Sequence, residues 1–375
     1  MSDSSILNNA ARILKLVQSG TPADQALRDS LTQTRHYTAP GERRGISRAV
    51  FTYYRWWRWL NEKESSQKQL TAALELQARF DQSPDAIKPA ALAARAVPDW
   101  LKTEMDDIPA AWLRQLQREP ALWIRPKQGL ETRVVPNLGK CEPAAIENFG
   151  IKTNAYRYTG ITDLYRTDEF QAGEFEIQDL ASQLVSHAAA PKPGETWWDA
   201  CAGEGGKTMH LSDLMQNKGL LWASDRSLRR LAKLKERAAR AKAFNFRAAQ
   251  WEGTTTLPTK TKFNGILVDA PCSGIGTWQR NPHARWTTLP KDVHELAAVQ
   301  KQLLENVSGS LKPGGRLVYA VCTLSRAETT AVADAFTAAH PELTPEPVLG
   351  RTPQLTLWPQ ELNANGMFIA SWRRR

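Results

Sequence analysis

The stretch Thr196-Trp-Trp-Asp199-Ala-Cys-Ala-Gly203-Glu-Gly205-Gly206-Lys207-Thr208 decides the fold. Its first four residues have the length and composition of a short buried strand, and the glycine-rich run that follows predicts a tight turn into a helix. Glycines let the backbone approach a ligand closely, and the N-terminus of the next helix presents free N–H groups. We therefore predict a strand, a ligand-binding turn and a helix in succession.

The same rhythm of strand, turn and helix recurs further along the chain. Apolar runs at 219–223, 265–268 and 315–321 have strand length, and residues 228–242 have a helical pattern. Alternation of this kind favours an α/β fold with a Rossmann-like, doubly wound, mostly parallel sheet and right-handed crossovers. We place this domain at residues 176–375.

The residues before this domain predict other folds. Apolar residues recur at helical spacing from Ile6 to Val17, Thr21-Pro22 marks a second helix start, and a third helix is expected over 40–60. We predict an all-α domain at 1–80, a linker at 81–97 and a small mixed α/β unit at 98–175. The small unit is expected to open with a helix over 98–117, followed by a strand over 121–125.

Composition narrows the class of protein. The 375 residues are 42% hydrophobic and 23% charged, and the first residues lack the pattern of a signal peptide. Four scattered cysteines without a Cys-x-x-Cys pair favour neither a disulfide framework nor a zinc site. We expect a cytoplasmic protein with reduced thiols, no membrane segment, no metal and a monomeric state.

The net charge of +10 and the pI of about 9.5 have two interpretations. One is solubility alone, and the other is an anionic partner such as nucleic acid. In the third helix, four arginines project on the side opposite Ile46, Val50 and Tyr53. That side is either a solvated face or a track for RNA phosphates; its residues are Arg44, Arg48, Arg55 and Arg58.

The glycine turn suits a nucleoside ligand. Asp225 ends the next predicted strand, where an acid can bind a ribose diol. The turn is neither Gly-x-Gly-x-x-Gly nor a phosphate-binding loop, so a ligand without a pyrophosphate fits better. S-adenosylmethionine is such a ligand, although a plain tight turn remains an alternative.

Two cysteines follow predicted strands. Cys272 lies in Asp269-Ala-Pro-Cys272-Ser-Gly274 and Cys322 follows the strand 315–321, so both are placed at the edge of the sheet where ligands bind. A cysteine can simply be a small buried apolar residue, and that interpretation stays open for each.

A thiolate at such an edge can perform covalent catalysis. Carbon 5 of cytosine is a weak nucleophile, but addition of a thiolate to carbon 6 makes it enamine-like and able to take a methyl group from a sulfonium. The thiol must be partly ionised. An acid such as Asp269 can hydrogen-bond the base as charge develops on its ring nitrogen.

Taken together, these motifs resemble the Sun-family RNA cytosine-5 methyltransferases, specifically the bacterial RsmB-like branch. The resemblance is carried by 199–208, Asp225, 269–274 and Tyr319-Ala-Val-Cys322. It implies a class I methyltransferase domain at 176–375. It also implies an RNA-recognition-like subdomain at 98–175 and a NusB-like RNA-binding domain at 1–80.

The resemblance also implies roles for individual residues. Cys322 is the expected nucleophile, Cys272 assists proton removal or product release, and Asp269 contacts both the base and the donor region. Independently of the resemblance, Arg280, just beyond the turn that carries Cys272, is a candidate RNA contact, as are the four arginines of the third helix. S-adenosylmethionine would be held by Cys201, Ala202, Gly203, Glu204, Gly205, Gly206, Lys207, Asp225, Gln250 and Asp269.

Three positions depart from the family pattern. Glu204 stands where the family has proline, and Val321-Cys-Thr replaces the usual Thr-Cys-Ser. An aspartate that the family directs toward adenine is missing, and Gln250 or Glu252 could replace it.

The expected function is methylation of carbon 5 of an RNA cytosine through a covalent Cys322 intermediate, with ribosomal RNA favoured over tRNA. Two alternatives stay open: a methyltransferase acting on a nitrogen or oxygen with structural cysteines, and a non-catalytic RNA-binding assembly factor.

Overall fold

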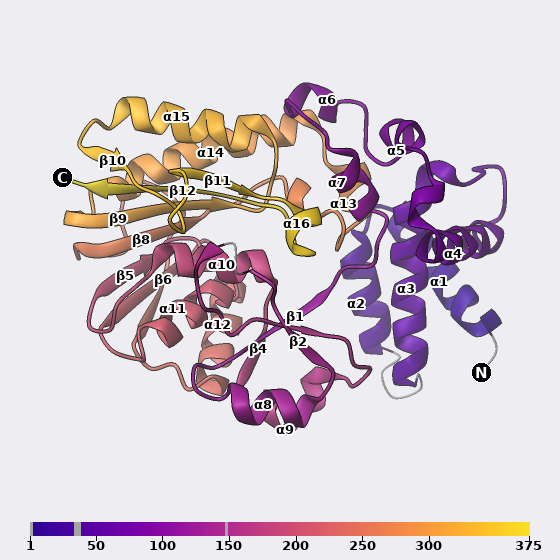
Figure 1. Ribbon diagram of the computed structural model, residues 1–375, viewed down its shortest axis with the longest axis horizontal. Helices are drawn as coiled ribbons and strands as arrows, with labels where there is room; N and C mark the ends of the chain where they lie inside the picture. The colour runs from indigo at the N-terminus through magenta and orange to yellow at the C-terminus, as the bar shows by residue number, and fades with distance from the viewer. Residues whose placement is uncertain (1–2, 34–38, 147–148) are drawn as a thin grey trace. The chain divides into compact units, whose positions relative to one another are not determined.

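The computed structural model describes residues 3–33, 39–146 and 149–375 (Figure 1). The chain forms two compact units, one of residues 1–120 with 277–290 and one of residues 121–276 with 291–375. The segment 277–290 therefore folds with the N-terminal residues, although the chain on both sides of it belongs to the second unit.

The first unit is helical where the structure describes it, as expected for residues 1–80. Its core contains Leu14, Leu27, Val50 and Leu70, which are all buried. Its elements are α1 (Asp3–Gln18), α2 (Ala23–Gln33), α3 (Pro40–Trp56), η1 (Trp57–Trp59), α4 (Ser66–Gln82), η2 (Pro84–Ala86), α5 (Pro89–Arg95), α6 (Leu101–Glu104), α7 (Ala110–Gln115) and α13 (Ala284–Thr287).

Two stretches of this unit differ from expectation. The single helix predicted over 98–117 is wrong: α6 ends before Met105, which is extended, and α7 starts after Pro109. Proline cannot continue a helix from its N-terminal side because it lacks an N–H, so the helix restarts there. Within the expected linker at 81–97, η2 and α5 form and Leu92 is buried. The expected domain boundaries stay a prediction.

Residues 277–290 are fixed in the first unit by the side chains of Arg285 and Trp286. Arg285 is 0% exposed and donates to the carbonyl oxygens of Ala96 (2.9 Å) and Leu116 (3.1 Å). The indole Nε1 of Trp286 donates to the carbonyl of Tyr54 over 2.7 Å. Because buried backbone carbonyls need partners, these bonds make the segment an integral part of the unit.

The second unit begins with a small antiparallel sheet in the order β2-β3-β1-β4. Ile124, Val134 and Phe175 form its core. This matches the small mixed α/β unit expected there, while its relation to RNA-recognition domains stays a prediction. Its elements are β1 (Leu122–Pro126), α8 (Glu131–Leu138), β2 (Cys141–Pro143), β3 (Tyr156–Tyr158), η4 (Leu164–Arg166), α9 (Asp168–Gln171) and β4 (Phe175–Ile177).

The larger sheet follows the order β10-β12-β9-β8-β5-β6-β7, with β11 paired to β12. Strands β7, β6, β5, β8 and β9 run parallel, and β10, β11 and β12 pair antiparallel. The predicted doubly wound, mostly parallel sheet is therefore confirmed. Its elements are α10 (Leu180–Ala189), β5 (Thr196–Asp199), α11 (Gly206–Leu214), β6 (Leu220–Asp225), α12 (Leu228–Arg240), β7 (Phe246–Gln250), β8 (Phe263–Asp269), η5 (Ile275–Thr277), α14 (Pro290–Ser308), β9 (Leu311–Val321), η6 (Arg326–Glu328), α15 (Thr330–Ala339), β10 (Leu343–Pro345), β11 (Gln354–Leu357), α16 (Pro359–Leu362) and β12 (Met367–Arg374).

Helices cover both faces of this sheet (Figure 1). Successive strand residues point to opposite faces, and the two tryptophans of β5 illustrate this: Trp197 packs with α10 and α11, whereas Trp198 packs with α14 and α15. Burial on both faces explains why these strands read as continuous apolar runs. Among the described helices, none is both long and apolar enough to cross a membrane.

Candidate active site

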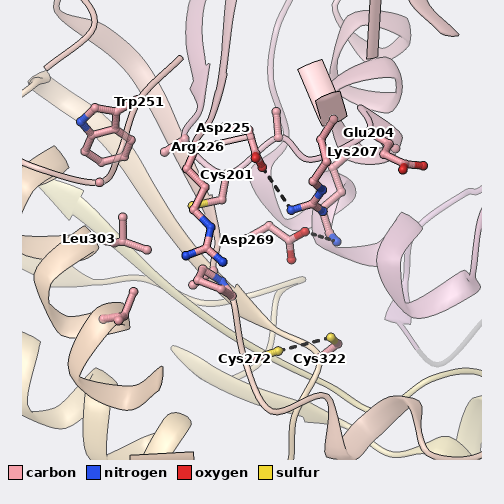
Figure 2. A pocket seen from close by; sticks show the side chains of 18 of the residues that line it. Cys201, Glu204, Lys207, Asp225, Arg226, Trp251, Asp269, Cys272, Leu303 and Cys322 are labelled. Carbon is pink, nitrogen blue, oxygen red and sulfur yellow. Dashed lines mark hydrogen bonds and ion pairs between the residues drawn. The ribbon is translucent and has the colours of Figure 1, made fainter. Parts of the chain in front are cut away.

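A cavity of about 560 Å³ opens at the carboxyl ends of the parallel strands (Figure 2). The strand order reverses beside β5, where β6 lies on one side and β8 on the other. Such a switch point is where open α/β sheets bind ligands. The wall is made by Ser182, Ala200, Cys201, Ala202, Glu204, Gly206, Lys207, Asp225, Arg226, Arg230, Trp251, Glu252, Gly253, Asp269, Ala270, Pro271, Cys272, Val299, Gln302, Leu303 and Cys322.

The glycine turn has the conformation that the sequence predicts. Gly205 has φ +86°, and a Cβ added there would lie 2.8 Å from the Cγ of Leu234 in α12. Only glycine combines this backbone conformation with so close an approach. The turn leads directly into α11 at Gly206, so the helix N-terminus faces the cavity. Among the predicted ligand residues here, Gly203 and Gly205 shape the turn, and their neighbours form the wall.

Glu204 is the residue that departs from the family pattern. Its carboxylate forms an ion pair with Lys233 of α12 over 3.2 Å, with both side chains about half exposed. Figure 2 shows Glu204 on the Lys207 side of the cavity, opposite Trp251 and Leu303. The acid is thus matched by a lysine on the neighbouring helix.

Asp225 is oriented by the turn itself. One carboxylate oxygen accepts from the Gly203 N–H (2.9 Å) and from Arg230 (3.2 Å), and the other accepts from the Ser227 N–H (2.8 Å). The carboxylate is almost fully buried yet belongs to the cavity wall. Its remaining lone pairs can accept hydrogen bonds from a diol.

The predicted ligand residue Gln250 is not in the cavity wall. Its side chain is exposed and donates to the carbonyl of Arg226 (3.0 Å) and to Glu252 (2.9 Å). Trp251 and Glu252, the next two residues, form the wall instead. Because β7 ends at Gln250, the chain turns there and directs its successors inward.

Lys207 and Asp269 form a charged pair in the wall. The ammonium lies 2.7 Å from the carboxylate, and the side chains are 10% and 29% exposed (Figure 2). Burial disfavours the charged lysine, but the nearby Asp269 more than offsets this, so the pKa of Lys207 is raised. The pair offers both a hydrogen-bond donor and an acceptor to a ligand.

Asp199, at the end of β5, is a buried acid beneath the turn. Thr208 donates to one of its oxygens over 2.6 Å, and the other oxygen has no protein partner. Burial raises the pKa of Asp199 to about 7, although the Thr208 bond acts in the opposite direction.

The two predicted catalytic cysteines meet. The Sγ atoms of Cys272 and Cys322 lie 3.3 Å apart, and both residues line the cavity (Figure 2). β8 and β9 are neighbouring parallel strands with Asp269 opposite Ala320. The turn after β8, which carries Cys272, therefore lies beside the turn after β9, which carries Cys322; we call these the two cysteine turns. The hydrogen bond to Cys322 and burial raise the pKa of Cys272 well above its ordinary value. The third wall cysteine, Cys201, has its pKa raised by burial.

Sequence reasoning missed several residues at this site, among them Arg230, Trp251 and Leu303 of the cavity wall and Glu328 behind it. Glu328, in η6, is fully buried and accepts hydrogen bonds from residues of both cysteine turns. The nearby hydroxyl residues Thr323 and Ser325 are the only local trace of this environment, because the donors Ser273 and Gln300 are distant in sequence. Within the described residues, no group of three or more His, Cys, Asp or Glu side chains is placed to hold a metal ion.

The predicted arginine face of α3 is partly wrong. Arg55 is 1% exposed and donates to Gln77 of α4 (3.1 Å), so it does not lie on a solvated face. Arg58 lies beyond the end of α3, in η1, and is held by the Val97 carbonyl (3.2 Å) and Asp99. Arg44 and Arg48 are exposed, with Arg48 paired to Asp81 and Glu119. Arg280 is also exposed and belongs to the same unit.

The fold and this site define a class I methyltransferase domain. Residues 186–373 match the family described as 16S rRNA methyltransferase RsmB/F. The chain belongs to that family, as the resemblance in its sequence predicts.

Three similar proteins extend this result. The probable ribosomal RNA small subunit methyltransferase B of Bacillus subtilis is 36% identical over 56% of this chain and 50% of its own length. A methyltransferase homologue from Pyrococcus horikoshii has a TM-score of 0.61 at 25% identity, covering 71% of this chain and 90% of that one. NSun6 from Pyrococcus horikoshii, solved with SFG, has a TM-score of 0.51 at 28% identity over 60% of each chain. The chain spans about half the length of the first curated relatives it matches.

Proposed function

We propose that this protein transfers a methyl group from S-adenosylmethionine to carbon 5 of a cytosine in RNA, through a covalent bond to Cys322. One observation carries the proposal: two cysteine sulfurs 3.3 Å apart in the wall of one cavity with the Lys207–Asp269 pair. Membership of the RsmB/F family supports it.

The cavity fits S-adenosylmethionine. Its volume lies in the range of small-ligand sites. The turn and the N-terminus of α11 present backbone N–H groups, Asp225 offers acceptors for the ribose hydroxyls, and Trp251 and Leu303 offer apolar surface. When bound, S-adenosylmethionine supplies an electrophilic methyl group.

The side chains then divide the chemistry. The thiolate of Cys322 bonds to carbon 6 of the base, and the electron pair released into the ring makes carbon 5 the nucleophile. Asp269 and Lys207 hydrogen-bond the polar edge of the base as charge develops there. After methylation of carbon 5, the proton on that carbon passes to solvent water, and Cys272, as a thiol, assists release by donating a hydrogen bond to the departing Cys322 sulfur. The sulfur–carbon 6 bond breaks, and the double bond of the ring returns.

The substrate proposed is ribosomal RNA, which the name of the family supports. Because a sulfur must reach the face of the ring, the cytosine has to be unpaired or turned out of its stack. The exposed arginines Arg44, Arg48 and Arg280 are proposed phosphate contacts. A cytoplasmic, monomeric protein remains the expectation.

The test is methyl transfer from isotope-labelled S-adenosylmethionine to RNA, with bisulfite sequencing to locate the product. We expect 5-methylcytosine with the wild-type chain and none with Cys322→Ala. Full turnover by Cys322→Ala, with the label on a nitrogen or oxygen, would favour a methyltransferase whose cysteines are structural. An absence of S-adenosylmethionine binding in calorimetry would favour a non-catalytic RNA-binding protein.

A further inference from the structure

Glu328 has an unusual environment for an acid. It is 0% exposed, and five donors surround its two carboxylate oxygens. Oε1 accepts from the Ser273 N–H (2.8 Å) and from Gln300 (3.0 Å). Oε2 accepts from the hydroxyls of Ser273, Thr323 (3.0 Å) and Ser325 (3.0 Å). Satisfying a buried carboxylate to this degree offsets its loss of hydration.

The donors come from both cysteine turns. Ser273 follows Cys272 directly, and Thr323 follows Cys322 directly; their hydroxyls also lie 2.9 Å apart. Gln300 of α14 extends the network, since it donates to the Pro271 carbonyl over 2.9 Å and accepts from Tyr319. The carboxylate is thus the common acceptor that joins the residue after one cysteine to the residue after the other.

We propose that Glu328 is a positioning residue that holds the Cys272 and Cys322 sulfurs in contact by bonding to both turns at once. The catalytic meaning of this inference rests on the proposed function. Its structural content does not, because the distance between the two thiols is a property of the protein alone.

A separate backbone contact makes the inference testable without loss of the fold. The Gly276 N–H donates to the Cys322 carbonyl over 3.0 Å, and the Gly276 carbonyl accepts from the Gly366 N–H over 2.8 Å. These bonds remain when the Glu328 side chain is shortened. We therefore expect variants at Glu328 to keep the main chains of the two turns together. The side chains of Cys272 and Cys322, however, should lose their fixed separation.

The charge of Glu328 has a second effect on the pair. The hydrogen bond to Cys322 and burial are the main causes of the raised pKa of Cys272, and the nearby Glu328 carboxylate adds to them. Cys272 is thereby kept as a thiol that can donate to its neighbour. The pKa of Lys207 is raised chiefly by Asp269, and Cys322 also contributes to this rise. The two cysteines are thus held in unequal surroundings.

The experiment measures thiol proximity directly. Purified full-length chain is treated with dibromobimane, which becomes strongly fluorescent when both of its arms have reacted with nearby thiols. Cys272→Ser and Cys322→Ser define the background from the remaining cysteines. We expect Glu328→Ala to lower the rate of cross-linking at least about tenfold relative to wild type. A wild-type rate in folded Glu328→Ala would overturn the inference.

Conservative variants distinguish a positioning role of Glu328 from a general loss of the folded structure. In Glu328→Gln the amide oxygen can still accept from Ser273 N–H and Gln300, and the amide N–H groups can donate to the hydroxyls, which are able to accept. We expect its cross-linking rate within about threefold of wild type. Glu361→Gln, at an exposed site in α16, is the matched control. Should Glu328→Ala not fold, Ser325→Ala and Thr323→Val each remove one donor, and a rate unchanged in both overturns the inference.

A kinetic measurement connects the position to the chemistry. Glu328 is not part of the cavity wall, so calorimetry should give an S-adenosylmethionine Kd for Glu328→Ala within about twofold of wild type. The kcat for methyl transfer to RNA should fall at least about tenfold and recover in Glu328→Gln. If the wild-type chain transfers no methyl group, the proposed function fails, while the cross-linking result still decides the role of Glu328.

Discussion

Cys272 and Cys322 share one hydrogen bond but differ in their surroundings. The raised pKa of Cys272 suits a group that stays protonated while its neighbour reacts. The sequence located both thiols at one edge because strand patterns place the ends of neighbouring strands together. It could not give their separation, which depends on the register between β8 and β9.

The division of roles gives a first prediction. If Cys272 serves release, Cys272→Ala should accumulate a protein–RNA adduct that survives denaturing gel electrophoresis, because the sulfur–carbon 6 bond no longer breaks. Cys322→Ala should form no adduct. The reverse pattern would exchange the two roles.

Asp199 gives a second prediction, on stability in the absence of ligand. Its pKa rises from an ordinary 3.8 to about 7 in the folded protein. Between these values the folded state binds more protons than the unfolded state, so its stability falls as pH rises toward 7. The difference amounts to about 4 kcal/mol as an upper limit, at about 1.4 kcal/mol per pKa unit.

Asp199→Asn cannot ionise, and so it should lack this decline. We expect the melting temperature of the variant, relative to wild type, to increase from pH 5 to pH 8. A difference that stays constant over this range would show that Asp199 is not protonated more readily in the folded state.

Residues whose partners are distant in sequence were the hardest to predict. Glu328 looks like an ordinary helix-start acid, since its donors reach it from three separate segments. Gln250 was expected in the site, but the chain turns after β7 so that Trp251 and Glu252 line the cavity in its place. Both outcomes depend on tertiary packing, which no local pattern contains.

At the scale of elements, helix α3 shows why a helical projection can mislead. The projection correctly separates Ile46 and Val50 from the arginines. It cannot reveal that α4 covers a second side of the helix, where Gln77 accepts from Arg55. Strands were better predicted, because runs such as 265–268 in β8 are apolar on both faces. The C-terminal strand β12 was not predicted as a strand from its pattern.

The segment that contains α13 gives a third prediction. Arg285→Ala removes hydrogen bonds to two buried carbonyls and leaves a cavity, so it should lower the free energy of unfolding by roughly 3 kcal/mol. Urea unfolding followed by tryptophan fluorescence measures this. A loss below about 0.5 kcal/mol would mean that the segment contributes little to the unit.

Arg280, five residues earlier, is the matched exposed position and carries the fourth prediction. Arg280→Ala should leave the unfolding midpoint unchanged and weaken RNA binding. The slope of log K against log salt should become shallower by roughly 0.7 to 0.9 if one phosphate contact is lost. An unchanged slope would remove Arg280 from the RNA-binding set.

For the whole molecule, the structure shows how part of the net charge of +10 is used. Part of it is structural: Arg237 and Arg240 of α12 pair with Glu176 of β4 at 2.7 and 2.6 Å, and Glu176 is buried. Composition therefore overstates the charge free to meet an anionic partner. The sequence predicted the sheet and the helical N-terminal part. It did not predict that residues 277–290 belong to the first unit while the chain before and after them belongs to the second. No local sequence pattern marks a segment that joins a different unit from its flanking residues.

The placement of residues 277–290 in the first unit limits how the protein can be divided into fragments. A fragment of residues 1–120 would lack the segment that carries Arg285, leaving the carbonyls of Ala96 and Leu116 without that donor. A fragment of residues 121–375 would keep residues 277–290 but lack the core into which they pack, and we expect this fragment to aggregate. Replacing residues 277–290 by a short glycine–serine bridge should restore its solubility, which light scattering can monitor. The first unit is thus completed by a segment whose sequence lies inside that of the second unit.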